Sequence, residues 1–322
     1  MVDMLSSLTL DMVRAARLQI ASHVRHTPIL QVKNIKQPIP QGKALWLKLD
    51  CLQVTGSFKA RGAVNKLLSL PPETLQRGII TASGGNHGLA VAYAGWMAQV
   101  PVTIYLPHNT PPAKAAKLHQ WGAKVVMEGA VWDDANRAAL MQAEQAQLAY
   151  LHPFADPFVM AGQGTLTLEI LEDLSEVDTL LVAIGGGGLI SGISLAAKAL
   201  RPDLKVIGVE ATGAPTLHAS LKAGQVIELA DVNTKANTLA PRKTEAMNFD
   251  IIRQCVDEGV LVTDEQMQAA ARWLWFEMGV AAELSGAAAV AAPQAGAYEP
   301  KSSSVVCALV CGAGTDGMNN TW

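Results

Sequence analysis

Charged residues, cysteines and long apolar runs are all scarce in this sequence. Aspartate, glutamate, lysine and arginine make up 16% of the 322 residues and form no basic run, so we expect no nucleic-acid partner. The longest apolar runs, such as residues 180–184, are far too short to cross a bilayer, so we expect no membrane span. Residues 1–5 lack the basic start and the apolar stretch of a signal peptide.

The four cysteines are Cys51, Cys255, Cys307 and Cys311, and their spacing is not that of a metal site. Cys307 and Cys311 are close in sequence, but no second pair of ligands lies near them. Cysteines scattered through apolar segments are typical of reduced thiols. We therefore expect a cytoplasmic protein without a cysteine-bound metal.

Half of the residues are hydrophobic, and short apolar runs alternate with alanine-rich stretches. The apolar runs predict buried parallel strands at residues 78–81, 102–106, 124–127, 179–184, 205–210 and 304–310. The alanine-rich stretches predict helices, most clearly at residues 87–99, 112–121, 132–147, 188–200 and 282–292. This alternation predicts an α/β fold of two lobes, with parallel sheets covered by helices and a shared cleft. Residues 230–262 are the least regular part of the sequence.

Residues 55–63 read Thr-Gly-Ser-Phe-Lys-Ala-Arg-Gly-Ala and predict a helix that opens near Ser57, with Lys59 in its first turn. The positive end of a helix dipole disfavours a cation and lowers the pKa of an amine there. A neutral amine is what a Schiff base requires, so Lys59 is a candidate for covalent cofactor binding. The alternative is a solvated surface lysine.

Two glycine-rich segments each follow a predicted strand and precede a predicted helix. Residues 81–88 read Thr-Ala-Ser-Gly-Gly-Asn-His-Gly, and their backbone N–H groups with the Ser83 hydroxyl are suited to a substrate carboxylate. An ordinary turn with Asn86 as helix cap is the alternative. Residues 184–191 read Ile-Gly-Gly-Gly-Gly-Leu-Ile-Ser, where four glycines permit close approach of a ligand and the following helix favours a phosphate. This loop is neither a Walker loop nor a clean G-x-G-x-x-G motif.

The last segment, residues 310–317, reads Val-Cys-Gly-Ala-Gly-Thr-Asp-Gly and follows the final predicted strand. The thiol of Cys311 could contact a ring nitrogen there, although a buried structural cysteine is the simpler interpretation. Taken together and in this order, the four segments resemble the fold type II (tryptophan-synthase-β-like) family of pyridoxal-phosphate (PLP) enzymes, in its serine/threonine dehydratase and serine racemase branch. The resemblance extends from about residue 27 to residue 316.

The resemblance implies a role for each residue of these segments. Lys59 binds the cofactor covalently and later moves the Cα proton of the substrate, while Phe58 packs beside the cofactor. Asn86 donates to the phenolic oxygen of the cofactor, and Cys311 contacts its pyridine nitrogen. The phosphate is held by backbone N–H groups of Gly185, Gly186, Gly187, Gly188 and Leu189. The substrate carboxylate is held by Ser83, Gly84, Gly85, Asn86 and His87.

By the same resemblance, residues 1–55 and 150–322 form a large PLP-binding domain and residues 56–149 a small substrate-side domain, with the cofactor in the cleft between them. A thiol beside the pyridine nitrogen leaves the ring neutral, which suits elimination of a β-substituent better than transamination. The implied reaction is loss of water from a small β-hydroxy amino acid, such as L-threonine or L-serine, to give a 2-oxo acid and ammonia.

Departures from the family pattern bear on the reaction. Gly84 stands where racemases have a second serine as the base on the opposite face, and Phe154 is usual in dehydratases, so both favour a dehydratase. Residues 236–239 read Ala-Asn-Thr-Leu where many members read Ala-Asp-Gly-Leu, and residues 241–244 are equally unfamiliar. Because this segment borders the active site in the family, a related substrate such as 3-hydroxyaspartate or phenylserine stays open.

Residues 209–214 align with the cation site of the branch, which implies Glu210 and the Ala214 carbonyl as ligands. Thr216 stands where a carboxylate is usual, so a weak divalent or a monovalent cation is expected rather than a strong divalent site. A strand-end carboxylate with a local partner is the alternative for Glu210. Glu283 matches a family glutamate near the active site, and an acid at a helix N-terminus is its alternative.

Other functions also stay open at this point. One is an amino-acid racemase or β-replacement enzyme on the same fold, and another is a nucleotide- or amino-acid-binding protein without catalysis, which would leave Lys59 without a role. Family members are commonly dimers or tetramers, so we expect a homodimer or homotetramer. The sequence ends at Trp322 without room for the regulatory domain of biosynthetic threonine deaminases, so we expect no feedback control by isoleucine.

Overall fold

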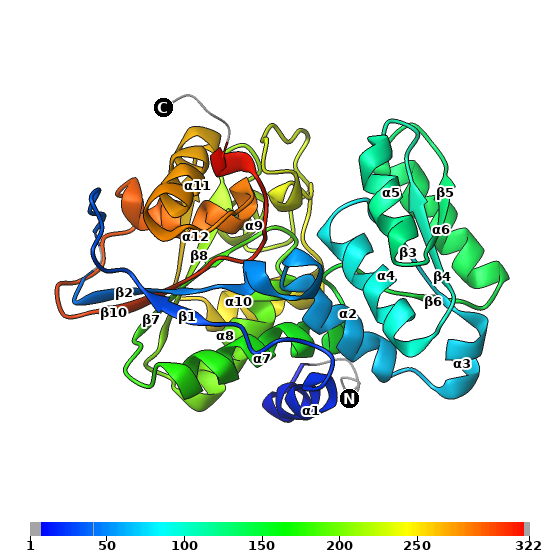
Figure 1. Ribbon diagram of the computed structural model, residues 1–322, viewed down its shortest axis with the longest axis horizontal. Coiled ribbons are helices and arrows are strands. Elements are labelled where there is room, and N and C mark those ends of the chain that lie inside the picture. Colours follow the sequence, from blue (N-terminus) through cyan, green and yellow to red (C-terminus); the bar gives the residue numbers. More distant parts are fainter. Residues whose placement is uncertain (1–7, 41, 319–322) are drawn as a thin grey trace.

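The computed structural model describes residues 8–40 and 42–318, so residues 1–5, which lack the features of a signal peptide, lie outside the described residues. Two sheets organise the described chain (Figure 1). The larger has the strand order β1-β2-β10-β7-β8-β9, and the smaller has the order β5-β4-β3-β6. Neighbouring strands pair in parallel except β1 and β2, which pair antiparallel at one edge. The predicted α/β fold is confirmed, with this antiparallel pair as an addition.

The six predicted strands are confirmed to within a few residues, whereas β1, β2, β6 and β9 were not predicted. The larger sheet contains β1 (Ile29–Gln31), β2 (Ala44–Lys48), β7 (Thr179–Ala183), β8 (Lys205–Ala211), β9 (Glu258–Val262) and β10 (Val305–Leu309). The smaller sheet contains β3 (Ile79–Ala82), β4 (Val102–Leu106), β5 (Lys124–Met127) and β6 (Ala149–Tyr150). The helices are α1 (Leu10–Ile20), α2 (Lys59–Leu68), α3 (Pro72–Arg77), α4 (Asn86–Ala98), α5 (Pro112–Gln120), α6 (Trp132–Gln145), α7 (Pro157–Asp173), α8 (Gly188–Leu200), α9 (Thr216–Ala223), α10 (Ala246–Cys255), α11 (Asp264–Met278) and α12 (Leu284–Gln294). None of them is both long and apolar enough to cross a membrane within the described ranges.

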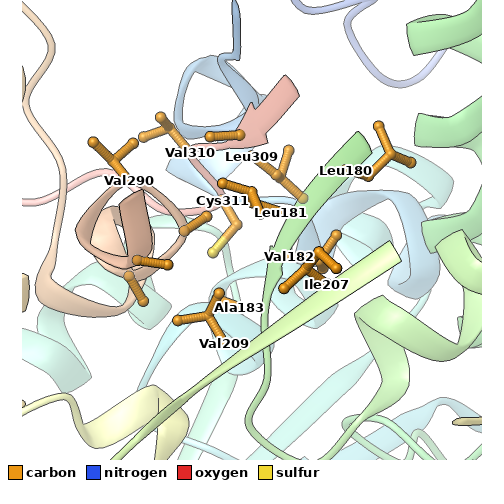
Figure 2. Packing of buried hydrophobic residues seen from close by; sticks show 14 of the residues in the cluster. Leu180, Leu181, Val182, Ala183, Ile207, Val209, Val290, Leu309, Val310 and Cys311 are labelled. Atoms are coloured by element: carbon orange, nitrogen blue, oxygen red, sulfur yellow. The ribbon is translucent and has the colours of Figure 1, made fainter. Parts of the chain in front are cut away.

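The central strands are largely apolar because helices cover both faces of each sheet. Strands β7 and β10 are buried along their whole length, and α12 packs against both, with α11 outside it. Figure 2 shows side chains of β7, β8 and β10 packed with Val290 of α12. In the smaller sheet β3 is fully buried, since both α4 and α6 pack against it. Runs without polar alternation are therefore what this packing requires.

Two long helices and the irregular stretch show what the apolar periodicity missed. Helix α7 starts after Asp156, whose carboxylate accepts from the N–H groups of Phe158 (2.8 Å) and Val159 (3.1 Å). Helix α11 starts with a reciprocal capping box between Thr263 and Gln266. Both signals are legible in the sequence as Asp-Pro and as Thr-x-x-Gln. Residues 230–262 contain a short 3₁₀ helix, η3 (Asn237–Leu239), followed by α10 and β9.

Three of the four segments predicted to carry chemistry follow the carboxyl ends of parallel strands. The turn that begins at Ser83 follows β3, the glycine loop follows β7, and Cys311 follows β10. Residues 79–150 supply the smaller sheet, whereas the larger sheet takes strands from both sides of that segment in the sequence. The division into domains at about residues 55 and 150 stays a prediction.

Candidate active site

A cavity lies where these segments meet. Its walls include every residue expected to hold a cofactor: Phe58, Lys59, Asn86, Gly185, Gly186, Gly187, Gly188, Leu189 and Cys311. The remaining lining residues are Phe154, Ala183, Thr238, Leu239, Glu283 and Ser285. The turn at residues 83–87, which is expected to bind the substrate carboxylate, contributes one residue, Asn86, to the cavity wall.

Lys59 is the first residue of α2, in the first turn as predicted. The helix start is fixed to the loop after β10, because Ser57 bridges Gly312 and the Phe58 N–H donates to the Cys311 carbonyl (3.1 Å). The Lys59 amine donates to the Pro153 carbonyl (2.7 Å). Burial lowers the pKa of Lys59 to about 8. The neutral fraction at pH 7 thereby rises from roughly 0.03% to roughly 10%, which makes the amine available for covalent chemistry.

The glycines between β7 and α8 are needed because protein packs against the loop on two sides. A Cβ at Gly185 would lie 2.6 Å from the Thr238 carbonyl, and a Cβ at Gly186 would overlap the Phe154 ring. Gly187 has a φ of +94°, which L side chains rarely adopt. The first N–H groups of α8 have no acceptor within their own helix, and the helix dipole adds positive potential. This cradle therefore suits a phosphate group.

The turn before α4 is held by its own polar groups and by one buried histidine. The Ser83 hydroxyl accepts from the Gly85 N–H (3.3 Å). Nε2 of His87 donates to the Leu151 carbonyl (3.0 Å), and burial, together with the charge of Lys59, lowers the pKa of His87 to about 3. The imidazole is therefore neutral and anchors the turn to the segment after β6. A Cβ at Gly85 would meet no atom within 4 Å, so this part of the turn faces open space.

Glu283 joins the two sides of the cavity. Its Oε1 accepts from the Asn86 amide (2.7 Å) and from the Thr238 hydroxyl (3.3 Å), and the Thr238 hydroxyl is also hydrogen-bonded to that of Ser285. Burial raises the pKa of Glu283. Glu283 precedes α12 as its N-cap residue, so it is an acid both at a helix N-terminus and in the cavity wall. The Asn86 amide keeps a second hydrogen for another acceptor.

Cys311 presents a neutral thiol at the end of β10. Its Sγ lies 3.6 Å from the Ser285 carbonyl, and the residue is buried beside Leu181 and Ala183 (Figure 2). Burial, reinforced by the nearby charge of Glu283, raises the pKa of the Cys311 thiol. All four cysteines lie in the described ranges, where they form no disulfide. A neutral thiol can meet an aromatic nitrogen without forcing a proton onto it.

Glu210 is occupied by a local partner, as its alternative interpretation predicted. Its two carboxylate oxygens accept from the N–H groups of Leu217 and His218, each at 2.7 Å, at the start of α9. Burial raises the pKa of Glu210 to about 7. Throughout residues 8–40 and 42–318, no three His, Cys, Asp or Glu side chains are grouped as a metal site. The cation expected at Glu210 and the Ala214 carbonyl stays a prediction.

A buried ionic cluster beneath α2 was missed in the sequence. Arg61 contacts Asp50 (2.8 Å) and Glu169 (2.6 Å), and Lys48 contacts Glu169 (2.8 Å). All four side chains are fully buried. The available signal was the pair of opposite charges in residues 47–50, Leu-Lys-Leu-Asp, beside the string that contains Lys59 and Arg61. The cluster fixes the helix that carries Lys59.

The residues present fit pyridoxal phosphate. The cavity combines a phosphate cradle, an amine of lowered pKa, a side-chain amide and a neutral thiol. Each group matches a different part of this cofactor: the phosphate, the aldehyde carbon, the phenolic oxygen and the pyridine nitrogen.

Comparison with known proteins identifies one enzyme family, and it is a family that uses the cofactor that the cavity fits. A family described as "Pyridoxal-phosphate dependent enzyme" matches residues 20–312. The chain is 40% identical over 285 residues to an L-threonine ammonia-lyase of Thermotoga maritima, which covers 88% of this chain and 71% of the relative. It is 33% identical over 308 residues to a serine racemase of Oryza sativa subsp. indica, which covers 94% and 90%. The solved structure of the processed form of threonine deaminase isoform 2 from Solanum lycopersicum matches with a TM-score of 0.87 at 32% identity, covering 96% of this chain and 86% of the other. The chain therefore belongs to the fold type II family of pyridoxal-phosphate dependent enzymes.

Proposed function

We propose that this protein is a PLP-dependent dehydratase, or ammonia-lyase, that removes water from a small β-hydroxy amino acid such as L-threonine or L-serine. The products are a 2-oxo acid and ammonia. The observation that carries the proposal is that the Lys59 amine lines the same cavity as the glycine loop at residues 185–188, and burial, which lowers the pKa of Lys59 to about 8, favours its neutral form. The similarity to an L-threonine ammonia-lyase supports the same reaction.

The chain's own residues divide the work. The N–H groups of residues 185–189 hold the phosphate, Asn86 donates to the phenolic oxygen, and the Cys311 thiol faces the pyridine nitrogen. When bound, the cofactor withdraws electrons from the substrate Cα and makes its proton acidic. The Nζ of Lys59 accepts this proton, while Glu283 keeps the Asn86 amide in place.

Gly84 favours elimination over racemisation. Racemisation needs a proton-transferring group on each face of Cα, and Lys59 supplies one face. Gly84, which stands where racemases have a serine, offers no such group. A Cβ at Gly84 would lie 3.2 Å from Leu106 and 3.3 Å from Thr110, so a side chain added here would crowd these two residues. A racemase remains the second candidate, because the rice serine racemase is 33% identical over most of the chain.

The test uses purified protein with Lys59→Ala, and Lys66→Ala as the matched control. Lys66 lies on the same helix but pairs with Asp156 (2.7 Å) away from the cavity walls. The wild type and Lys66→Ala are expected to absorb near roughly 410–420 nm, as a lysine-bound cofactor does, and to release 2-oxo acid. Lys59→Ala is expected to lose both. If Lys59→Ala keeps both the absorption band and the release of 2-oxo acid, the proposal of a PLP enzyme is wrong. If L-serine gives more D-serine than 2-oxo acid, the protein is a racemase and not a dehydratase.

We also propose the properties that accompany such an enzyme. The protein serves amino-acid catabolism in the cytoplasm and forms a homodimer or homotetramer, which light scattering measures directly. A monovalent or weakly bound divalent cation sits at Glu210 and the Ala214 carbonyl. Raised thermal stability in potassium or magnesium salt over a matched choline salt supports that cation, and equal stability in all three contradicts it.

A further inference from the structure

Thr238 differs from the other polar residues of the cavity wall, because it is exposed and stands on the 3₁₀ turn η3. It occupies the second position of Asn237-Thr238, where many members read Asp-Gly. Its side chain is exposed and yet lines the cavity, so it lies at the boundary between cavity and solvent. Any group that a substrate extends toward this mouth meets a threonine side chain instead of a bare backbone.

This side chain is held in place from both ends. Its hydroxyl is hydrogen-bonded to Glu283 (3.3 Å) and to the hydroxyl of Ser285. Its backbone carbonyl packs against Gly185 so closely that a Cβ there would be 2.6 Å away. The turn before it is tied to α11, since Asp264 accepts from the Lys235 N–H (2.7 Å). Thr238 therefore cannot rotate away to make room without breaking hydrogen bonds.

The position of Thr238 relative to Asn86 places it at the substrate end of the cavity. Both side chains donate to the same oxygen of Glu283, so their polar atoms lie within about 6 Å of each other. Asn86 belongs to the turn expected to bind the substrate carboxylate, and that carboxylate and the substrate Cβ are attached to the same Cα. A large group on Cβ that extends from that turn toward the mouth would meet the Thr238 side chain.

We propose that Thr238 is a specificity-determining residue: it closes the side-chain end of the cavity, so that the site admits amino acids with a small Cβ substituent and excludes those with an aromatic one. The inference rests on the proposed function and narrows its substrates to serine and threonine rather than phenylserine. It makes no use of the elimination step, so it can be tested by binding alone.

The experiment titrates holoenzyme with L-alanine and L-phenylalanine, which carry no leaving group on Cβ, and follows binding by calorimetry and by the cofactor absorbance. The variant is Thr238→Gly, and the matched control is Asn237→Gly, which loosens the same turn at a residue outside the cavity walls. Thr238→Gly is expected to bind L-phenylalanine at least about tenfold more tightly relative to L-alanine, the discrimination a small steric change gives. Asn237→Gly is expected to keep the wild-type ratio.

Two further variants separate size from hydrogen bonding. Thr238→Val keeps the volume and is expected to keep the exclusion of L-phenylalanine, whereas Thr238→Ser is expected to relax it in part. Equal binding of both amino acids by the wild type overturns the inference, and so does an identical ratio in Thr238→Gly and Asn237→Gly. The proposed function fails in a different way. In that case the wild type releases no 2-oxo acid from L-serine or L-threonine, whatever the ratio of its affinities for L-phenylalanine and L-alanine.

Discussion

Replacing Glu169 by glutamine measures how much the buried ionic cluster contributes to the free energy of unfolding. Glu169 accepts from Arg61 (2.6 Å) and Arg17 (2.7 Å), and its second oxygen lies 2.8 Å from the Lys48 amine. Burial alone would raise its pKa, but the hydrogen bonds and charges of Arg61 and Lys48 outweigh burial and lower the pKa of Glu169 from 4.5 to about 2. Glutamine keeps one acceptor and turns two N–H donors toward cations.

The magnitude follows from this shift. At 1.36 kcal/mol for each pKa unit, the interactions of the ionised Glu169 contribute about 3 kcal/mol. Since Glu169 has the lower pKa in the folded state, this contribution is present above pH 4.5 and is lost as the pH falls toward 2. Removing one partner of a buried ion pair costs about 3–5 kcal/mol, and the lower end applies here because Arg61 keeps Asp50 (2.8 Å) and Lys48 keeps Asp173 (3.4 Å). We expect Glu169→Gln to lower the free energy of unfolding by about 3 kcal/mol at pH 7.

Urea unfolding of the holoenzyme measures this loss, with Glu172→Gln as the matched control. Glu172 pairs with the same Arg17 (3.0 Å) but is 56% exposed, so its loss is expected to cost less than about 1 kcal/mol. The difference in unfolding free energy between Glu169→Gln and Glu172→Gln should decrease as the pH is lowered below 4.5, because Glu169 then becomes protonated in the wild type. Equal stability of both variants at pH 7, or a gap independent of pH, would refute the assignment of the stability to Glu169.

Substitutions at two other positions, Cys311 and Glu210, test the site and its surroundings. Cys311→Ser is expected to retain elimination activity within about tenfold, because a hydroxyl also donates to a neutral ring nitrogen, whereas Cys311→Asp is expected to protonate the ring and shift the absorption and product ratio. Loss of all activity in Cys311→Ser with the cofactor still bound, or an unaltered spectrum in Cys311→Asp, would contradict contact with the ring. Glu210→Gln is expected to cost about 1–3 kcal/mol in urea unfolding, because its amide turns an N–H toward one of the two backbone donors at the start of α9. If Glu210→Gln is as stable as the wild type, the two hydrogen bonds from Glu210 to the start of α9 do not contribute to the free energy of unfolding.

The sequence alone was sufficient for the fold class and for most of the cavity wall. Buried parallel strands and glycine-rich turns are local patterns, and the carboxyl ends of parallel strands meet at one edge of a sheet. The positions of Lys59, Asn86, Cys311 and residues 185–188 around one cavity followed from that rule together with the family resemblance. The start of α7 at Asp156 is equally local, because the side chain of Asp156 caps the N–H groups of Phe158 and Val159.

The tertiary structure decided what depends on contacts between distant segments. The pKa of Lys59 is lowered by burial in the packed cavity wall, which one helix terminus does not reveal. Glu283 meets Asn86 and Thr238 across 197 and 45 residues of sequence, so their shared hydrogen bonds left no periodic pattern to detect. Arg61 and Glu169 are likewise 108 residues apart. Hydrophobic periodicity records which face of an element is buried, whereas the partner of each buried polar group is fixed only when the elements pack together.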